Sequence, residues 1–391
     1  MSEAAASAAV LDGQVLIIGA GLIGGSIGLG LSAARGDGGA SGDVIVRDAS
    51  PGTARLAEEL GVGRVQPQRA AETGRGQGFD PQLVVVATPP DVAAPVILGA
   101  LEEFPRATVV DVASVKEPIA RQVLAEGAER GIDTSRYVGT HPMAGRETSG
   151  VVGARSDLFR GRPFVIVPHA HSAPASVRLA RNLGIDLGAV VVDVDAATHD
   201  EAVAYVSHVP QLVASLLASR LPQASDEALS LSGQGLRDTT RIAASDPRLW
   251  VEILSANAGA ILPVLHGLRE DLGAVVDAFD RLVTPDAAPG SRAVIARAIA
   301  RGNDGVRRIP GKHGSGPDAF VTITVLVPDT PGALARLLTD MGEEGINLED
   351  LRLEHSLGQP VGLAHVSVGR ADESAVLGML EARGWARASE E

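Results

Sequence analysis

The sequence predicts an α/β protein with a doubly wound parallel sheet at its N-terminus, an all-α region in the middle and a small α+β domain at its C-terminus. Short apolar runs alternate with longer amphipathic stretches from Gln14 to about Pro168, which is typical of parallel strands joined by helices. From about Ile185 apolar residues recur at three- and four-residue spacing, which indicates helices. Beyond Pro317 strand-like and helix-like stretches alternate again.

Each strand of the N-terminal sheet is expected where a short apolar run is bounded by turn-forming or polar residues. The runs are Val15–Ile18, Val44–Val46, Leu83–Ala87, Thr108–Val112, Tyr137–Gly139 and Phe164–Val167. We expect residues 1–10 to form a disordered lead-in and residues 11–184 to form the sheet domain.

The helical region is expected to span residues 185–302, after one last strand candidate at Ala189–Val194. Its clearest amphipathic stretches are Val209–Leu221 and Ile253–Leu268. So much amphipathic helix outside a sheet domain usually buries its apolar face against a second copy of the chain. We therefore expect a homodimer.

The C-terminal part begins with a linker at residues 303–318, which is rich in Gly, Pro and basic residues and has no periodicity. Residues 319–391 then predict a β-α-β-β-α order, close to a ferredoxin-like unit, with a final strand that is short or absent. The expected elements are Phe320–Val327, Pro331–Met341, Leu348–Glu354, Val361–Val368, Glu373–Arg383 and Trp385–Ser389.

Net charge, the length of apolar runs and the cysteine content indicate which partners and which cellular compartment the protein can have. The net charge of −14 would repel a nucleic-acid backbone, and an anionic substrate would need local cations to overcome this charge. No apolar run reaches the length of about 18 residues that a membrane span needs, so we expect none. The sequence has no cysteine, which excludes disulfides and thiolate chemistry and fits a cytoplasmic protein.

A glycine-rich turn lies directly after the first strand and opens a helix. Its residues are Gly19, Ala20, Gly21, Leu22, Ile23 and Gly24. Glycines at this spacing let backbone amides and a helix N-terminus approach a pyrophosphate, as in a Rossmann dinucleotide site. Asp48 ends the next strand and would bind the ribose hydroxyls of NAD and repel the 2′-phosphate of NADP. Alternatively, Arg47 could accept that phosphate, and a glycine pattern by itself can be a simple loop.

Two further strand ends carry polar residues, and ligands of open α/β sheets bind at the carboxyl ends of strands. Thr88 and Pro89 follow the strand at Leu83–Ala87, where the proline also sets a rigid turn. Asp111 and Ser114 lie at the end of the next strand, and they either belong to the site or cap the helix after it.

The residues best suited to proton transfer and anion binding lie farther along the chain. His141 stands at a strand end, well placed for acid–base chemistry near neutral pH. Ser207, His208 and Gln211 lie at the start of a helix. Arg241 could bind a carboxylate through two hydrogen bonds, or pair with neighbouring aspartates on a helix surface.

Taken in chain order, these motifs resemble those of prephenate dehydrogenases over nearly the whole chain. The matching stretches are Gly19–Ser26 (GAGLIGGS), Asp111–Lys116 (DVASVK), His141–Gly145 (HPMAG), Ser207–Pro210 (SHVP), Asp238–Ala243 (DTTRIA) and Trp250. The resemblance implies an NAD-dependent oxidative decarboxylation of prephenate to 4-hydroxyphenylpyruvate in tyrosine biosynthesis, with no metal.

The resemblance also implies roles for individual residues. His141 would take the proton of the substrate hydroxyl, and Ser114 would orient His141 or that hydroxyl. Arg241 would hold a substrate carboxylate. His208 and Trp250 would line the side-chain end of the substrate, in a site to which a neighbouring subunit could contribute.

Gln211 departs from the family pattern, because relatives that prefer prephenate often carry a histidine at this position. A neutral glutamine can accept a hydrogen bond from the ammonium group of arogenate, which a protonated histidine would repel. We therefore expect arogenate, which gives tyrosine directly, to be at least a competent substrate.

The C-terminal stretch Val327–Ala335 (VPDTPGALA), together with Gly345–Asn347, resembles an ACT domain, a small ligand-sensing module. Gly332, near a helix N-terminus, would leave backbone amides free for a ligand carboxylate, and Asn347 would reach the amino group. The expected effector is an aromatic amino acid, tyrosine first. The alternative is a domain that only dimerises.

Two other functions remain as alternatives for a chain of this build. A β-hydroxyacid dehydrogenase or an imine reductase relies on a lysine in its helical domain, but the only lysines here are Lys116 and Lys312, both outside that region. A non-catalytic ligand sensor would not need His141, Ser114 and Arg241 together.

Overall fold

The computed structural model describes residues 10–35, 44–66, 79–145, 150–284, 290–309, 320–355 and 361–388. The expected lead-in at residues 1–10 lies outside this part of the chain except for Val10. The chain separates into two compact units. Unit 1 consists of Met1–Ser219 and Ile242–Leu265, and unit 2 consists of Arg220–Arg241 and His266–Glu391.

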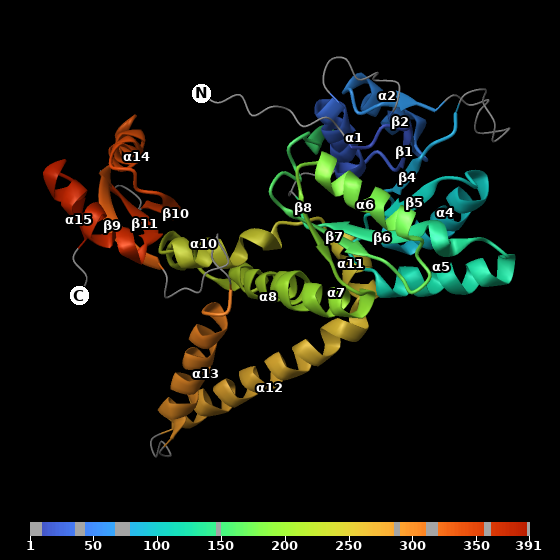
Figure 1. The fold of residues 1–391 in the computed structure, drawn as a ribbon. Helices are drawn as coiled ribbons and strands as arrows, with labels where there is room; N and C mark the ends of the chain where they lie inside the picture. The colour runs from blue at the N-terminus through green and yellow to red at the C-terminus, as the bar shows by residue number, and fades with distance from the viewer. Residues whose placement is uncertain are drawn as a thin grey trace. The chain divides into compact units, whose positions relative to one another are not determined.

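Unit 1 is built on an eight-stranded sheet with the order β3-β2-β1-β4-β5-β6-β7-β8 (Figure 1). Its neighbouring strands are parallel except for β6 and β7, which are antiparallel. The predicted parallel sheet is thus confirmed up to β6, and the antiparallel β7 makes the sheet mixed. The strands are β1 (Val15–Ile18), β2 (Val44–Arg47), β3 (Arg64–Val65), β4 (Leu83–Val86), β5 (Thr108–Asp111), β6 (Tyr137–Pro142), β7 (Pro163–Val167) and β8 (Val190–Asp193).

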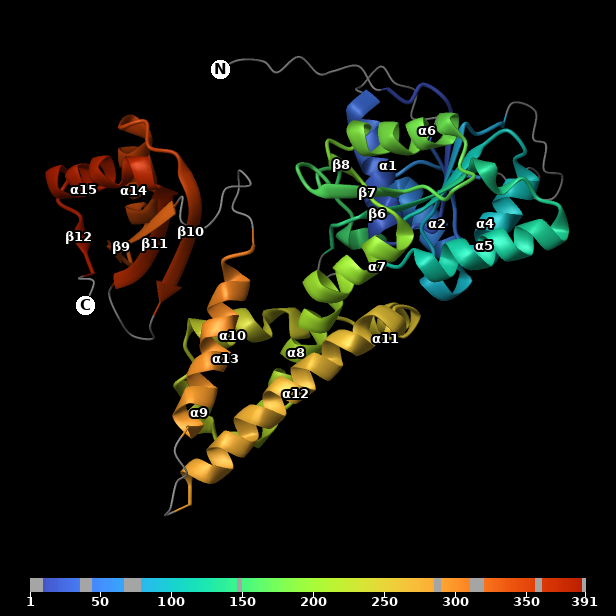
Figure 2. The same ribbon diagram turned by 60° about the horizontal axis from the view of Figure 1, so that its bottom comes forward.

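Helices cover both faces of this sheet, which is why its central strands are near-continuous apolar runs, VLII in β1 and LVVV in β4. One face packs against α4 and α5, and the other packs against α1 and α6 (Figures 1 and 2). The helices around the sheet are α1 (Leu22–Arg35), α2 (Pro51–Glu59), α4 (Pro90–Glu103), α5 (Glu117–Arg130) and α6 (Pro174–Asp186).

Two boundaries differ from the sequence prediction. Strand β8 pairs with β7, so the sheet domain continues to residue 193, past the end expected at residue 184. Strand β6 continues past Gly139 to Pro142, because His141 and Pro142 pair with Val165 and Phe164 of the antiparallel β7. The pairing with β7 therefore holds His141 inside the sheet.

The helical part of unit 1 starts with one long helix that contains an irregular turn. Pro210 stands in the first turn of α8 and has no N–H to donate, which is a local cause for the π-helical turn η4 before it. An apolar cluster of Ala204, Val209 and Ile261 joins this helix to α12. The elements are α7 (Ala196–Val203), η4 (Ala204–His208), α8 (Val209–Ala218), α11 (Pro247–Ala256) and the start of α12 (Ala258–Leu282).

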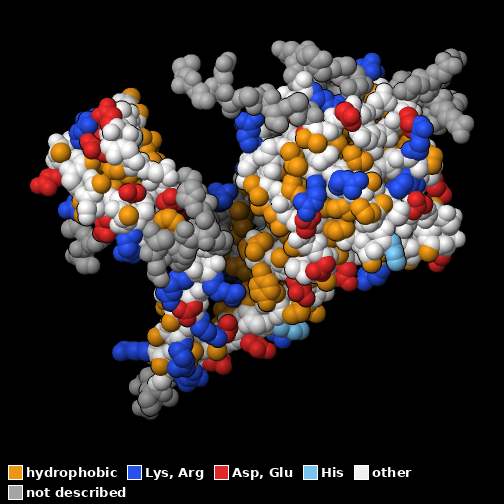
Figure 3. All heavy atoms as spheres, in the orientation of Figure 1, with side chains coloured by type: hydrophobic (Ala, Val, Ile, Leu, Met, Phe, Trp, Pro, Cys, Tyr) orange, Lys and Arg blue, Asp and Glu red, His pale blue; other side chains and the backbone are white. Residues whose placement is uncertain are grey.

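Large apolar side chains are exposed on these helices, among them Leu216 and Leu217 of α8 and Leu249 of α11. Apolar side chains are visible at the surface between charged ones in Figure 3. The continuous helix Ala196–Gln223 is long and apolar enough to cross a membrane by length and composition alone. This is a weak indication, because core helices of soluble proteins meet the same criterion.

Unit 2 contains further helices and a C-terminal sheet domain. Its helices are α9 (Asp226–Ser230), α10 (Gln234–Thr240), most of α12, and α13 (Ser291–Val306). Helix α13 runs to Val306, so the linker expected to start at residue 303 starts later. Residues 310–319 of that linker lie outside the described part of the chain.

The C-terminal sheet is antiparallel, with the order β10-β11-β9-β12. Alternate residues of β9, such as Ile323 and Val325, form a core with Leu337 of α14 and Val376 of α15. The final strand is present as the two residues of β12, so the ferredoxin-like β-α-β-β-α-β order is complete. The elements are β9 (Phe320–Pro328), α14 (Ala333–Glu343), β10 (Leu348–His355), β11 (Val361–Gly369), α15 (Glu373–Ala382) and β12 (Ala386–Arg387).

Candidate active site

The glycine-rich turn between β1 and α1 has the geometry of a dinucleotide site. Gly19 has a φ of 104°, and a Cβ there would lie 2.3 Å from the carbonyl oxygen of Ala87. A Cβ on Gly24 would lie 2.0 Å from the carbonyl oxygen of Gly19. At Gly21, by contrast, a Cβ would meet nothing within 4 Å. The turn is therefore tight at its ends and open at the position where a pyrophosphate approaches the backbone.

Two neighbouring features fit the same ligand. Leu22 and Ile23 form the first turn of α1, whose N-terminal amides suit an anion. Thr88 lies at the carboxyl end of β4, and its hydroxyl is buried without a hydrogen-bond partner among the described residues. Pro89 follows as the N-cap residue of α4. An unpaired buried hydroxyl beside the glycine turn fits a polar group of a bound cofactor.

The residues at the end of β2 favour NAD. Asp48 accepts a hydrogen bond of 2.8 Å from the backbone N–H of Ala20, so its carboxylate lies against the glycine turn. Arg47 is engaged elsewhere. It makes hydrogen bonds of 2.8 and 2.6 Å to the carboxylate of Glu103 and one of 2.6 Å to Gln66. The carboxylate is therefore in place for ribose hydroxyls, and the neighbouring arginine is held by other side chains.

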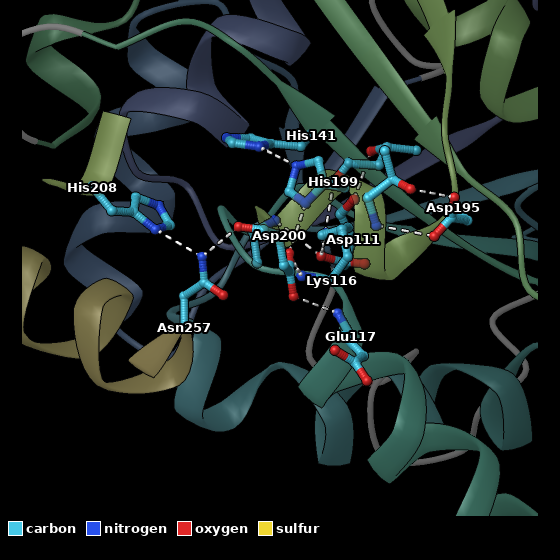
Figure 4. A network of polar contacts seen from close by, with 12 residues as sticks. Asp111, Lys116, Glu117, His141, Asp195, His199, Asp200, His208 and Asn257 are labelled. Atoms are coloured by element: carbon cyan, nitrogen blue, oxygen red, sulfur yellow. Dashed lines mark hydrogen bonds and ion pairs between the residues drawn. The ribbon is translucent and has the colours of Figure 1, made fainter. Parts of the chain in front are cut away.

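The ring of His141 contacts a second histidine (Figure 4). Its Nδ1 lies 2.8 Å from Nε2 of His199, and Nδ1 of His199 lies 2.7 Å from Oδ1 of Asp200. The exposed fractions of the three residues are 9%, 2% and 3%, in the same order. We call this chain of hydrogen bonds, His141, His199 and Asp200, the His141 relay.

Asp200 is held by the N-terminus of helix α5. Its Oδ1 accepts a hydrogen bond of 2.8 Å from the backbone N–H of Lys116, and its Oδ2 accepts one of 2.8 Å from that of Glu117. Lys116, the N-cap residue of α5, supplies no side-chain cap of its own. The capping role considered for Asp111 or Ser114 is therefore filled by Asp200, which satisfies amides at the start of α5.

A buried ion pair lies behind His141. Nζ of Lys116 pairs with Asp111 and donates a hydrogen bond of 2.7 Å to the carbonyl oxygen of Thr140. The hydroxyl of Tyr137 donates to Asp111 at 2.8 Å. Burial lowers the pKa of Lys116 and raises that of Tyr137 well above its ordinary value. Because Thr140 precedes His141, these contacts fix the backbone at the end of β6.

Asn257 connects the relay to His208. Its Nδ2 donates a hydrogen bond of 2.8 Å to the backbone carbonyl of Asp200 and lies 2.9 Å from Nδ1 of His208. The ring of Trp250 meets that of His208 edge to face, with 6.2 Å between centroids and an angle of 83°. Two of the predicted substrate-binding residues are thus in contact, and His208 is joined to His141 through Asn257, the backbone and side chain of Asp200, and His199.

Both histidines are uncharged at neutral pH. Burial lowers the pKa of His141 well below its ordinary value, and the repulsion that its protonated form would meet from protonated His199, Lys116 and His208 lowers it further. Burial likewise lowers the pKa of His208 to about 4. Uncharged imidazole is the form that can accept a proton from a substrate.

The remaining predicted residues of unit 1 are placed as follows. Ser114 is half-buried after β5, and within the described residues no hydrogen bond joins its hydroxyl to His141. The orienting contact expected from Ser114 comes instead from His199. Ser207 is half-buried in η4. Gln211 is buried in the first turn of α8 and donates to the hydroxyl of the serine one turn farther on at 3.4 Å.

Three predicted residues, Arg241, Gly332 and Asn347, belong to unit 2. Arg241 opens a short 3₁₀ turn, Arg241–Ala243, and is exposed. Gly332 has a φ of 87° and is the N-cap residue of α14, without a side-chain cap. Asn347 is exposed directly before β10. The roles of these three residues stay predictions.

His199, Asp200 and Asn257 take part in the site without having been predicted. The available signal was the adjacent pair His199-Asp200 on the helix that also carries His208. Such a pair near a helix start is usually solvated, and only the packing of α7 against α5 buries it. No sequence pattern marks Asn257.

Comparison with known proteins gives the family. The model of the prephenate dehydrogenase nucleotide-binding domain matches residues 34–193, and that of its dimerization domain matches residues 195–283. The chain is 34% identical over 376 residues to the probable prephenate dehydrogenase NovF of Streptomyces niveus, covering 95% of this chain and 98% of the relative. It is 28% identical over 374 residues to the prephenate dehydrogenase of Bacillus subtilis, covering 92% and 93%.

Solved structures agree with this result. The prephenate dehydrogenase of A. aeolicus, in complex with hydroxyphenyl propionate and NAD+, matches with a TM-score of 0.60 at 26% identity, covering 75% of this chain and 99% of that one. A putative prephenate dehydrogenase from Corynebacterium glutamicum matches with a TM-score of 0.59 at 27% identity, covering 76% and 90%. The glycine turn, the Asp48 contact and these matches together show that the chain belongs to the prephenate dehydrogenase family and is an NAD-dependent oxidoreductase, with the family's dimerization domain at residues 195–283.

Proposed function

We propose that this chain oxidatively decarboxylates prephenate to 4-hydroxyphenylpyruvate, with Nε2 of His141 as the proton acceptor. The observation that carries the proposal is the hydrogen bond between Nδ1 of His141 and His199, which leaves Nε2 for the substrate. When bound, NAD+ supplies the hydride acceptor. His141 takes the hydroxyl proton while hydride leaves the same carbon, and carbon dioxide departs from the opposite ring carbon. The proton returns to the oxygen as the ring becomes aromatic, so the base is regenerated.

The surroundings of His141 suit this role. Burial keeps its ring neutral, so no proton must be lost before substrate binds. The ion pair of Lys116 and Asp111 holds the peptide that precedes it. We assign to Ser114, at the end of the neighbouring strand β5, the orientation of the substrate hydroxyl. His208 and Trp250, which contact each other, line the side-chain end of the substrate, with Ser207 beside them.

The carboxylate clamp is assigned to Arg241. A guanidinium group can hold a carboxylate through two parallel hydrogen bonds, which fixes orientation as well as charge. The chain carries a net charge of −14, so a dianionic substrate requires a local cation. The support is the residue type together with its place in the stretch Asp238–Ala243 (DTTRIA).

Arogenate is proposed as a second substrate. Gln211 is buried in the first turn of α8, three residues after His208, and its amide has no charge at any pH. A carbonyl oxygen there can accept a hydrogen bond from the ammonium group of arogenate without repelling it. The same amide can donate to the ketone of prephenate, so neither substrate is excluded.

NAD+ is proposed to be strongly preferred over NADP+. The carboxylate of Asp48 lies against the glycine turn, where a 2′-phosphate would meet a like charge. Arg47, the residue that could offset this repulsion, is bound to Glu103 and Gln66.

A cytoplasmic location is proposed as well. Its support is the use of NAD+ as cofactor and a sequence without cysteine, which fits a reducing compartment.

The C-terminal domain is proposed to be an ACT sensor of an aromatic amino acid, tyrosine first. Its ferredoxin-like sheet has a core of its own. Gly332 leaves the first amides of α14 without a side-chain cap, so they can meet a ligand carboxylate, and Asn347 is exposed and able to reach an amino group. Binding would change substrate affinity, and substrate would change effector affinity by the same factor.

The proposed reaction is tested by mixing the purified full-length chain with NAD+ and prephenate, and separately with arogenate, and following NADH. Formation of NADH with release of carbon dioxide supports it. A protein that binds NAD+ but oxidises neither compound would contradict it.

A further inference from the structure

We propose that His199 and Asp200 are positioning residues that fix the proton of His141 on Nδ1, and that the backbone carbonyl of Asp200 acts through Asn257 to fix the proton of His208 on Nε2. The carboxylate of Asp200 thereby makes one imidazole a base, and its backbone carbonyl makes the other a hydrogen-bond donor. This inference rests on the proposed role of His141 as the proton acceptor.

Each hydrogen bond of the relay is donated toward Asp200: His141 donates to His199, and His199 donates to Asp200. Both carboxylate oxygens of Asp200 accept from backbone amides, so Nδ1 of His199 must be the donor in its 2.7 Å contact with Oδ1. A neutral histidine with its proton on Nδ1 has a lone pair on Nε2. That lone pair accepts from Nδ1–H of His141 across 2.8 Å, which leaves the lone pair of His141 on Nε2.

The contacts of Asn257 place the proton of His208 on the other ring nitrogen, Nε2. Its partner at 2.8 Å is the backbone carbonyl of Asp200, which can only accept, so the atom that faces it is the amide nitrogen. The same nitrogen lies 2.9 Å from Nδ1 of His208 and donates its second hydrogen there. Nδ1 of His208 therefore carries the lone pair, and the proton of this ring is on Nε2. Figure 4 shows both branches meeting at Asp200.

The relay also acts after proton transfer. Once His141 is an imidazolium, its charge lies two hydrogen bonds from the carboxylate of Asp200, an arrangement like that of a Ser-His-Asp triad with one more imidazole inserted. Among the other groups around the ring, Lys116 and Asp111 are paired with each other and Tyr137 and His208 are uncharged. Asp200 is thus the carboxylate that offsets the new charge.

If His199 and Asp200 had only a structural role, their substitution would lower stability without a specific effect on turnover. Asp200 caps α5, and its loss would destabilise that helix whether or not the relay matters. Variants at His199 separate the two roles, because they leave the cap intact. His199→Phe keeps the ring volume and removes both nitrogens. His199→Gln keeps an oxygen that can accept from His141.

The experiment uses full-length protein labelled with ¹⁵N in the histidine rings and saturated with NAD+. Long-range ¹H–¹⁵N spectra report which ring nitrogen carries the proton, and His141→Asn and His208→Asn assign the two rings by the loss of their signals. Turnover is measured in parallel on His199→Phe, His199→Gln and Asp195→Ala. The last is the matched control, because Asp195 caps the same helix, α7, through Thr198 and lies outside the relay.

The expected spectra show His141 protonated on Nδ1 and His208 protonated on Nε2. In His199→Phe the Nδ1–H form of His141 is lost and His208 is unchanged, and kcat falls by about one to three orders of magnitude with little change in KM. His199→Gln recovers part of kcat, and Asp195→Ala lowers Tm with near-normal kcat. A wild-type His141 protonated on Nε2, or a His199→Phe enzyme with normal kcat, overturns the inference. If His141→Asn were itself fully active, the proposed base would be wrong as well.

Discussion

The guanidinium group of Arg47 holds the carboxylate of Glu103 through two hydrogen bonds, at 2.8 and 2.6 Å. Both side chains are largely shielded, with 28% and 23% exposed. In the sequence, Arg47 beside Asp48 left open whether this site discriminates against a 2′-phosphate. The pair with Glu103 engages the guanidinium group, and Asp48 lies against the glycine turn, which supports the proposed preference for NAD+.

The first prediction concerns the cofactor. Asp48→Asn should raise the ratio of kcat/KM for NADP+ to that for NAD+ by about tenfold or more, since it removes a like-charge contact with the 2′-phosphate. Steady-state kinetics with both cofactors measure this ratio. Arg47→Gln is the matched control and should leave the ratio nearly unchanged. A wild-type enzyme that uses NADP+ as well as NAD+, and loses that ability in Arg47→Gln, would show that the arginine binds the phosphate.

The second prediction concerns the base. His141→Asn should lower kcat by about two to four orders of magnitude, the usual size of a general-base contribution, and leave the Kd for NAD+ unchanged. Single-turnover kinetics and calorimetry with NAD+ separate these effects. Near-normal turnover by His141→Asn would rule out this residue as the proton acceptor.

The third prediction concerns pH. His141 must be uncharged to act, and its pKa lies well below the ordinary value because the ring is buried. Since a lowered pKa keeps the base deprotonated at lower pH, kcat/KM should stay constant as pH falls through about 6.5 and decline only at lower pH. The measurement is the acid limb of kcat/KM against pH. A limb with a midpoint at or above the ordinary histidine value would contradict the structure.

The fourth prediction concerns the substrate anchor. Arg241→Ala should raise KM for prephenate by about ten- to a hundredfold, the cost of a lost charge-assisted contact, and change kcat less. Arg248→Ala is the control, because Arg248 is exposed and pairs with Asp246 at 3.6 Å. Equal effects of both substitutions, or a loss of Tm alone in Arg241→Ala, would favour the surface-pair role.

The fifth prediction concerns the C-terminal domain. A chain ending after Ile309 should remain active and lose any inhibition by tyrosine, because every catalytic candidate precedes the linker. Asn347→Ala in the full chain should weaken tyrosine binding without changing turnover in its absence, and calorimetry measures the affinity. If the shortened chain is inhibited by tyrosine as the full chain is, then tyrosine acts at the active site.

Local sequence patterns were enough to predict most of the architecture. The apolar runs from Val15 to Val167 predicted the strands within a few residues, except for the two-residue edge strand β3, since strands buried on both faces have a simple composition. The antiparallel direction of β7 could not be predicted, because nothing in its own sequence encodes which neighbour it pairs with. That direction matters to the site, since pairing with β7 carries β6 on to His141.

The candidate site was predictable only in part, for the same reason. The glycine turn, Asp48 and His141 stand at strand ends, where chain position indicates function. His199 and Asp200 acquire their roles from a contact between two helices, α7 and the N-terminus of α5, that are far apart in the sequence. Asn257 joins through one side-chain amide. A tertiary contact of this kind leaves no local periodicity to detect.

The product balance of the full-length wild-type enzyme with NAD+ and prephenate, compared with that of His141→Asn under the same conditions, tests both the proposed reaction and its proposed base. The wild-type enzyme should form one NADH and one carbon dioxide for each prephenate consumed, with 4-hydroxyphenylpyruvate as the organic product, and arogenate in its place should yield tyrosine. His141→Asn should bind NAD+ with the same affinity and form NADH at least about a hundredfold more slowly. A wild-type protein that binds NAD+ and forms no NADH from either compound, or a His141→Asn enzyme as fast as wild type, would contradict the assignment.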